Sequence, residues 1–109
     1  MKLLITGSGT LLGNTLVLRA LKKKYKIIAS YRKSFPKNLK KKDVSLIKID
    51  LEKKIKPDCK IDCLIHCASA IPSDNLSDKK MMRINYIGFK ELSLKLIANG
   101  CKKIIFISN

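Results

Sequence analysis

A glycine-rich segment near the start of the chain constrains the fold most. Residues 6–13 read Thr-Gly-Ser-Gly-Thr-Leu-Leu-Gly and follow a short apolar run at 2–6, while residues 11–24 have the apolar spacing of a helix. A glycine-rich turn between a strand and a helix lets backbone amides approach a phosphate at the positive end of the helix dipole. The segment therefore predicts a strand–turn–helix unit that holds a pyrophosphate; the alternative is a glycine-rich turn without a ligand.

Apolar runs alternate with helical segments along the rest of the chain. Further strands are expected at 26–31, 45–50, 61–67 and 103–108. A basic loop with one helical turn is expected at 32–44, and the longest helix at 77–99, where Gly100 ends it. The positions expected on the apolar sides of the two helices are Leu12, Leu16, Ala20 and Leu21, and Met81, Ile84, Leu92, Leu96 and Ile97.

Apolar strands separated by helices predict an α/β fold with a parallel sheet covered on both faces. We expect residues 1–109 to form one doubly wound, five-stranded domain. No helix follows the fifth strand in this sequence, so the domain is expected to be incomplete at its C-terminal end. An uncovered strand predicts that the chain self-associates.

The charge of the chain is +16, with 24 Lys and Arg residues against 8 Asp and Glu. A basic nucleic-acid-binding domain is therefore an alternative, but the cations are mostly scattered lysines, which favours a solvated surface. No apolar run is long enough for a membrane span, and the N-terminus lacks the features of a signal peptide. We expect a cytoplasmic protein whose four cysteines are thiols.

Three of these cysteines lie close together, at Cys59, Cys63 and Cys67, beside His66. Their spacing differs from that of zinc and iron–sulfur sites. On a strand, Cys63 and Cys67 share one face and His66 points to the other. We therefore predict buried thiols and no metal site.

Five segments in order resemble the extended short-chain dehydrogenase/reductase family, which includes nucleotide-sugar epimerases, dehydratases and reductases. That family opens with Thr-Gly-x-x-Gly-x-x-Gly, and Thr6, Gly7 and Gly13 match, whereas Thr10 stands at the middle glycine. The other four segments are Asp50-Leu51, Leu64 to Ala70, Asn85 to Gly88, and Lys103 to Ser108. The resemblance covers the whole chain and implies a Rossmann-like domain that binds a nicotinamide dinucleotide.

The resemblance also implies which residues bind this cofactor. The pyrophosphate would lie against Gly7, Thr10, Leu11, Leu12 and Gly13. Asp50 and Leu51 would lie near the adenine. Cys67, Ala68 and Ser69 would border the ribose and nicotinamide, and Asn85 belongs to the Asn-x-x-Gly of the long helix.

Charge at the end of the second strand favours NADP over NAD. An NAD site uses an acidic residue there to bind the ribose 2′-hydroxyl. Here the strand is followed by Arg32, Lys33 and Ser34, and the first acidic residue after the glycine motif is Asp43. Arg32 and Lys33 suit a 2′-phosphate, although two ordinary surface cations are the alternative.

The catalytic residues implied by the family have no counterpart in this sequence. Asn109 stands at or beside the position of the catalytic Ser or Thr, and the family's Tyr-x-x-x-Lys is missing. Tyr86 and Lys90 have that spacing but precede the fifth strand, so we interpret them as a coincidence. These residues are therefore expected to bind the cofactor without catalysing a reaction alone, and a nucleotide-sugar substrate would need a further C-terminal region. A non-catalytic NADP-sensing module is the alternative.

Overall fold

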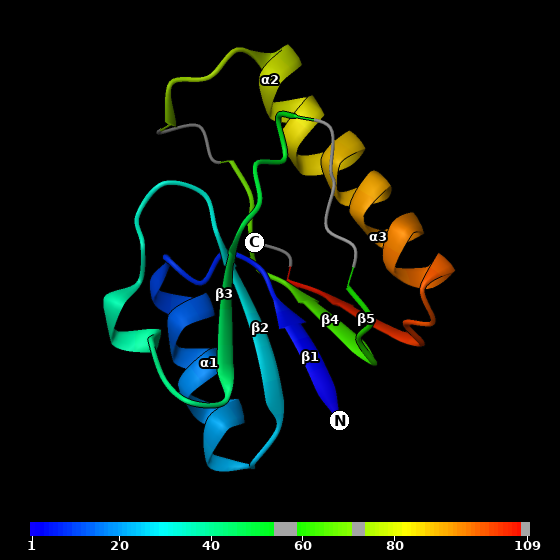
Figure 1. Cartoon of the computed structure of the whole chain (residues 1–109). Coiled ribbons are helices and arrows are strands. Elements are labelled where there is room, and N and C mark those ends of the chain that lie inside the picture. Colours follow the sequence, from blue (N-terminus) through cyan, green and yellow to red (C-terminus); the bar gives the residue numbers. More distant parts are fainter. Residues whose placement is uncertain (54–58, 71–73, 108–109) are drawn as a thin grey trace.

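The computed structural model describes residues 1–53, 59–70 and 74–107. A five-stranded sheet runs through the molecule (Figure 1) and contains β1 (Lys2–Ile5), β2 (Lys26–Tyr31), β3 (Val44–Lys48), β4 (Cys63–His66) and β5 (Lys103–Phe106). The strand order is β3-β2-β1-β4-β5, and every neighbouring pair is parallel. This Rossmann-like topology confirms the predicted α/β fold.

The helical elements are α1 (Leu11–Lys22), the 3₁₀ turn η1 (Lys37–Leu39), α2 (Asp78–Met82), the π-helical segment η3 (Arg83–Gly88) and α3 (Phe89–Ala98). The single helix expected at 77–99 is thus a continuous helical segment with a π-helical middle. Gly100, at φ +100°, ends it as predicted. The amides of Gly100 and Cys101 donate to the carbonyls of Ile97 and Leu96, at 3.0 and 2.9 Å, which satisfies the last turn. None of the helices in the described ranges is long and apolar enough to cross a membrane.

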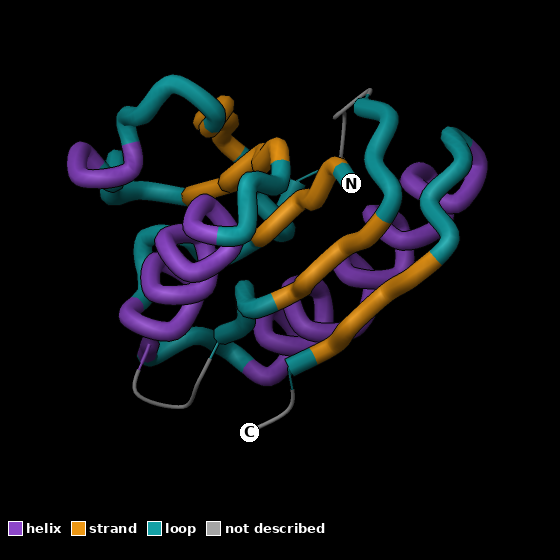
Figure 2. Tube along the Cα trace, turned by 90° about the horizontal axis from the view of Figure 1, so that it is seen from below, coloured by secondary structure: helices purple, strands orange, loops and turns teal. Residues whose placement is uncertain are grey.

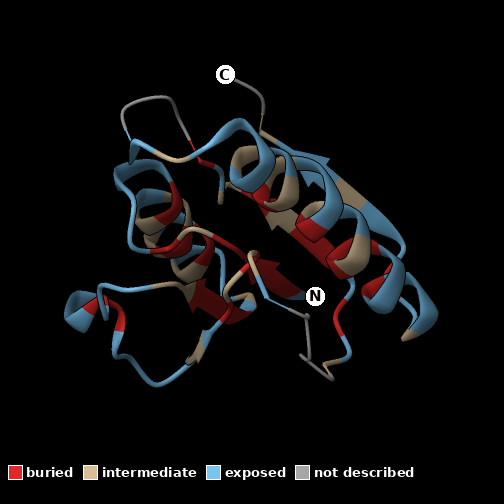
Figure 3. Cartoon of the chain, turned by 90° about the horizontal axis from the view of Figure 1, so that it is seen from above, coloured by how far each residue is buried: buried red, intermediate tan, exposed pale blue. Residues whose placement is uncertain are grey.

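The two faces of the sheet carry separate apolar cores because successive strand residues point to opposite sides. On one face, Leu3 and Ile5 pack in a cluster with Val17 of α1. On the other face, Leu4 and Leu64 pack in a cluster that includes the α3 side chains Leu92 and Leu96. Figure 2 shows the course of the two helical layers, and Figure 3 shows the buried residues gathered on the strands and on the helix sides that face them.

Two positions expected on the buried sides of the helices are exposed. Leu12 is 47% exposed because α1 turns Gly13 and Val17 towards the sheet instead. Ile97 is 52% exposed because α3 buries Leu92, Ser93 and Leu96, and the next residue lies about 100° further around the helix. The apolar pattern therefore located both helices correctly, but it was wrong in predicting that Leu12 and Ile97 face the sheet.

The edge strand β5 leaves apolar side chains in contact with solvent. Ile105 is 38% exposed and Phe106 is 49% exposed. Neighbouring strand β4 pairs with β5 along one side only, and no described strand pairs with the other side of β5. Asn109, considered above for the catalytic position, lies outside the described residues.

His66 occupies a closed apolar slot at the end of β4. The ring is 1% exposed and lies 4.8 Å from the ring of Phe89 and 6.0 Å from that of Phe106, measured between centroids. Its Nδ1 lies 2.9 Å from the Thr6 hydroxyl, and its Nε2 has no hydrogen-bond partner within the described part of the chain. Burial lowers the pKa of His66 from 6.5 to about 4. The folded chain therefore holds this imidazole in its neutral form.

The buried histidine predicts a loss of stability in mild acid. The unfolded chain binds a proton near pH 6.5 and the folded chain only near pH 4, so stability is complete above pH 6.5 and falls as the pH drops towards 4. Between pH 7 and pH 5 we expect a loss of roughly 2 kcal/mol in the free energy of unfolding, measured with urea.

Because His66 is the chain's single histidine, this loss can be assigned directly. His66→Gln should remove most of the difference between pH 7 and pH 5, whatever its effect on stability at pH 7. An NMR titration that found an ordinary histidine pKa in the folded chain would contradict the assignment.

Candidate functional site

A cavity lies at the carboxyl edge of the sheet. The chain runs from β1 outward to β2 and β3 and then returns to β4 on the other side of β1. This reversal creates a crevice between the loops that follow β1 and β4, the usual ligand position in open α/β sheets. A cavity of about 260 Å³ occupies it, bordered by residues that follow β1, β2, β3 and β4.

The loop after β1 depends on two glycines in close contact. Gly7 has φ +68°, and a Cβ there would lie 2.9 Å from the backbone nitrogen of Ala68. A Cβ at Gly13 would lie 2.1 Å from the carbonyl oxygen of Gly7. Any side chain at Gly13 would therefore push helix α1 away from the turn. Gly9 has no such constraint, since a Cβ there would only approach the Ser34 carbonyl, at 3.3 Å.

Thr10, which replaces the family's middle glycine, acts as the N-cap of α1. Its φ of −87° is open to any residue, so the turn does not require glycine here. The hydroxyl donates to the Gly7 carbonyl at 2.7 Å and accepts the Gly13 amide at 3.2 Å. Asn14 donates the next helix bond, to the Thr10 carbonyl. In the described part of the chain, the amides of Leu11 and Leu12 therefore remain as unbonded donors of the first turn.

Two partly buried sets of hydrogen bonds fix the loop after β4. The Thr6 hydroxyl oxygen accepts from the amides of Cys67, at 3.0 Å, and Ala68, at 3.1 Å. The Asn85 side chain accepts from the Ala70 amide at 2.7 Å and donates to the Ala70 carbonyl at 2.9 Å. Asn85 thus supports the cavity wall from η3 without lining the cavity itself.

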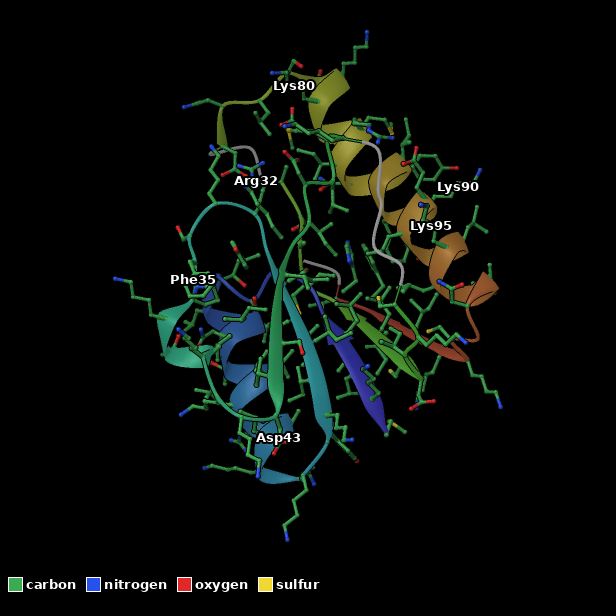
Figure 4. All side chains as sticks on the ribbon, viewed as in Figure 1. Arg32, Phe35, Asp43, Lys80, Lys90 and Lys95 are labelled. Atoms are coloured by element: carbon green, nitrogen blue, oxygen red, sulfur yellow. The ribbon has the colours of Figure 1, made fainter. Side chains whose placement is uncertain are left out.

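Cations stand where β2 ends. The cavity is bordered there by Ser30, Tyr31, Arg32, Lys33 and Ser34. Figure 4 shows Arg32 on the loop after β2, at the opposite end of the molecule from Asp43, which precedes β3. Arg32 makes no hydrogen bond or ion pair with any described residue. Residues 30–34 include no carboxylate, although Asp74 also borders the cavity. Its charge is available to an anionic ligand.

Hydrogen bonds from η3 hold the loop after β3 in place. Asp50 accepts the Glu52 amide at 3.0 Å, so its carboxylate closes a turn and does not reach the cavity, whereas Leu51 does. Arg83 of η3 donates to the carbonyls of Glu52, at 3.1 Å, and Lys53, at 2.8 Å. Its guanidinium also forms a two-point ion pair with Glu91, at 2.8 and 3.2 Å.

The structure brings about half of the expected binding residues together. Those that border the cavity are Gly7, Thr10, Arg32, Lys33, Leu51, Ala68 and Ser69, together with Ser34. Those that do not are Leu11, Leu12, Gly13, Asp50, Cys67 and Asn85. Side chains that the sequence argument missed also line the cavity, namely Tyr31, Ile49, Asp74 and Ile84. The sequence could have placed Tyr31 and Ile49 at the cavity, because both stand at the ends of expected strands. No pattern in the sequence indicates that Asp74 and Ile84 would line it.

The remaining candidates lie apart from the cavity. The four cysteines are free thiols, and burial raises the pKa of Cys63 and Cys67. Cys63 and Cys67 pack on the α1 face, whereas the His66 ring contacts Phe89 on the α3 side, as the strand pattern predicted. The described ranges contain no group of three or more side chains that could hold a metal ion. Tyr86 is 58% exposed on η3 and does not border the cavity.

Solved structures similar to this chain include sugar-nucleotide epimerases and dehydrogenases. A UDP-galactose 4-epimerase matches with a TM-score of 0.85 and 17% identity, over 100% of this chain and 38% of that one. ADP-L-glycero-D-manno-heptose-6-epimerase from Helicobacter pylori matches with a TM-score of 0.80 and 23% identity, over 99% of this chain and 39% of that one. Serine dehydrogenase from Escherichia coli matches with a TM-score of 0.81 and 20% identity, over 100% of this chain and 62% of that one.

At these identities the likeness shows the fold alone, and the chain spans 38% to 62% of the length of these proteins. No curated protein matches the sequence. The sequence does match the NAD dependent epimerase/dehydratase family over residues 3–109. Because that match extends over nearly the whole chain, the protein belongs to the NAD-dependent epimerase/dehydratase family and corresponds to its N-terminal region.

Proposed function

We propose that this chain is the NADP-binding part of an epimerase/dehydratase-family oxidoreductase. The observation that carries the proposal is the cavity at the crevice between β1 and β4. The tight glycine turn borders it on one side and the unpaired Arg32, with Lys33, on another. Nicotinamide dinucleotide is the cofactor typical of this family. When bound, it supplies hydride transfer.

The geometry of the glycine loop suits a pyrophosphate. The free amides of Leu11 and Leu12 begin α1, where N–H groups and the helix dipole favour an anion. Gly7 and Gly13 keep Cβ atoms out of this space. Leu11 and Leu12 would thus contribute through their backbone, since their side chains are exposed and lie outside the cavity wall.

On the other walls, some residues would contact the cofactor and others would hold the loops in position. Leu51 would lie against the adenine, with Asp50 shaping the turn behind it. Ala68 and Ser69 would border the ribose and nicotinamide. Cys67 and Asn85 would act indirectly, since their hydrogen bonds hold that loop in place.

Charge favours NADP. The 2′-phosphate is an anion that Arg32 and Lys33 could bind, and the cavity wall has no acidic residue at the end of β2 for a ribose 2′-hydroxyl. The related structures include one with NADP and others with NAD, so the proposed preference for NADP rests on Arg32 and Lys33. A nucleotide-sugar substrate is proposed by analogy with the epimerases, one of which binds UDP-glucose. We place the protein in the cytoplasm, where its four free thiols remain reduced.

The proposed 2′-phosphate contact predicts a change in cofactor preference. Arg32→Ala and Lys33→Ala should each weaken NADPH binding by roughly ten-fold, because each removes a charge-assisted contact. NADH affinity should change by less than about three-fold, since NADH has no 2′-phosphate. Titration calorimetry or fluorescence of the reduced nicotinamide measures both affinities.

Lys37→Ala provides the matched control for these variants. Lys37 is an exposed cation of the same loop that does not border the cavity, so its loss changes net charge equally. Equal losses of NADPH affinity in Lys37→Ala and Arg32→Ala would indicate general electrostatic attraction. Failure of the unchanged chain to bind either dinucleotide would overturn the proposed function.

Self-association of the chain is a prediction, and β5 is the surface expected to mediate it. We expect light scattering after gel filtration to show dimers or larger species, because β5 presents an open edge with Ile105 and Phe106 exposed. Ile105→Lys should shift the chain towards a monomer. Leu94→Lys is the control, as Leu94 is 57% exposed on α3 rather than on β5. A monomeric unchanged chain at micromolar concentration would contradict the prediction.

A further inference from the structure

The loop between β2 and β3 carries the proposed phosphate-binding cations on little regular structure. Between Tyr31 and Val44 its helical content is the three-residue turn η1. Leu39 is fully buried and anchors the far part of the loop under α1. Arg32, Lys33 and Ser34 lie between the end of β2 and this anchor, so a link from η1 to the glycine loop would hold the segment that carries them.

A reciprocal pair of amide side chains provides that link. Asn14 Nδ2 donates to Asn38 Oδ1 at 3.0 Å, and Asn38 Nδ2 donates to Asn14 Oδ1 at 2.9 Å. Asn14 lies in the first turns of α1 and Asn38 lies in η1, 24 residues apart in sequence. Each side chain donates through its amide nitrogen and accepts through its amide oxygen. The pair therefore fixes the relative orientation of α1 and η1 as well as their distance.

The same Asn14 amide also reaches the glycine loop. Asn14 Nδ2 also donates to the carbonyl oxygen of Ser8, at 3.3 Å. An amide nitrogen carries two hydrogens, so it can donate to Ser8 and to Asn38 at the same time. Ser8 is itself fully buried, and both its amide and its hydroxyl donate to the Ser30 carbonyl at the end of β2, at 2.9 and 2.7 Å. One side chain therefore joins the loop after β1 to the loop that carries the cations.

We propose that Asn14 and Asn38 form an amide latch that sets cofactor selectivity by holding the cationic loop beside the glycine loop. The inference rests on the proposed function and names two positioning residues that do not border the cavity. The glycine loop keeps its own supports, including the Ser8–Ser30 bonds and the Gly13–Gly7 contact. Loss of the latch thus frees the Arg32 and Lys33 segment while leaving the pyrophosphate cradle in place.

The test measures NADPH and NADH affinities of the full chain and its variants. Asn38→Ala should lower NADPH affinity by roughly five-fold and NADH affinity by less than about two-fold. The double variant Asn14→Ala/Asn38→Ala should lose about as much NADPH affinity as Asn14→Ala alone, because both changes remove the same pair. Thr15→Ala is the control, since its hydroxyl bonds only the Leu11 carbonyl of its own helix and should leave both affinities unchanged.

Hydrogen exchange in the cofactor-free chain tests the latch separately from binding. Amides of residues 32–39 should exchange faster in Asn38→Ala than in Thr15→Ala, while the core strands exchange as before. Unchanged exchange, or equal loss of NADPH and NADH affinity, would overturn the latch even if NADPH binds tightly. An unchanged chain that binds neither dinucleotide would refute the proposed function, and with it the role in selectivity, whatever the exchange result.

Discussion

The first turn of α1 lies directly on the peptide group of Gly7, and the geometry of the cavity depends on this contact. A Cβ at Gly13 would come within 2.1 Å of the Gly7 oxygen, so the helix could not begin where it does with any other residue there. The contact brings the amide end of α1 to the carboxyl edge of β1. Because β1 lies in the middle of the sheet, the loops after β2 and β4 then lie on either side of this helix end.

Most polar side chains near the cavity hold backbone rather than face a ligand. Thr6 and Asn85 fix the loop after β4, Thr10 caps α1, and Arg83 fixes the loop after β3. A cradle built from backbone needs few particular side chains at its surface. The same fold occurs, at TM-scores of 0.80 to 0.85, in proteins that are only 17% to 23% identical.

Much of this arrangement could be predicted from the sequence. The five parallel strands are mostly apolar, so each was recognisable, although β3 and β5 at the sheet edges are only partly buried. The glycine spacing located the turn. Thr10 departs from the family motif, but its φ of −87° does not require glycine, and its hydroxyl caps α1.

Other features depend on contacts that no local pattern encodes. In the π-helical segment η3, Gly88 packs against Leu51, where a Cβ would lie 2.8 Å from the Leu51 carbonyl oxygen, and Arg83 donates to the carbonyls of residues 52 and 53. Both contacts are long-range, so the sequence suggested one uniform helix. The exposure of Ile97 has the same origin, since packing against the sheet selects which of two neighbouring apolar residues points inward.

The high net charge of +16 illustrates the difference between composition and placement. At physiological salt a surface charge is screened within about 8 Å, so scattered lysines attract anions of every kind weakly. Arg32 differs from them because it is half-buried at a cavity wall and makes no bond within the described chain. Under the proposed function, one dinucleotide would contact both this charge and the amides that begin α1. Selectivity for a particular anion thus depends on the few cations whose positions the fold fixes, however many others the sequence contains.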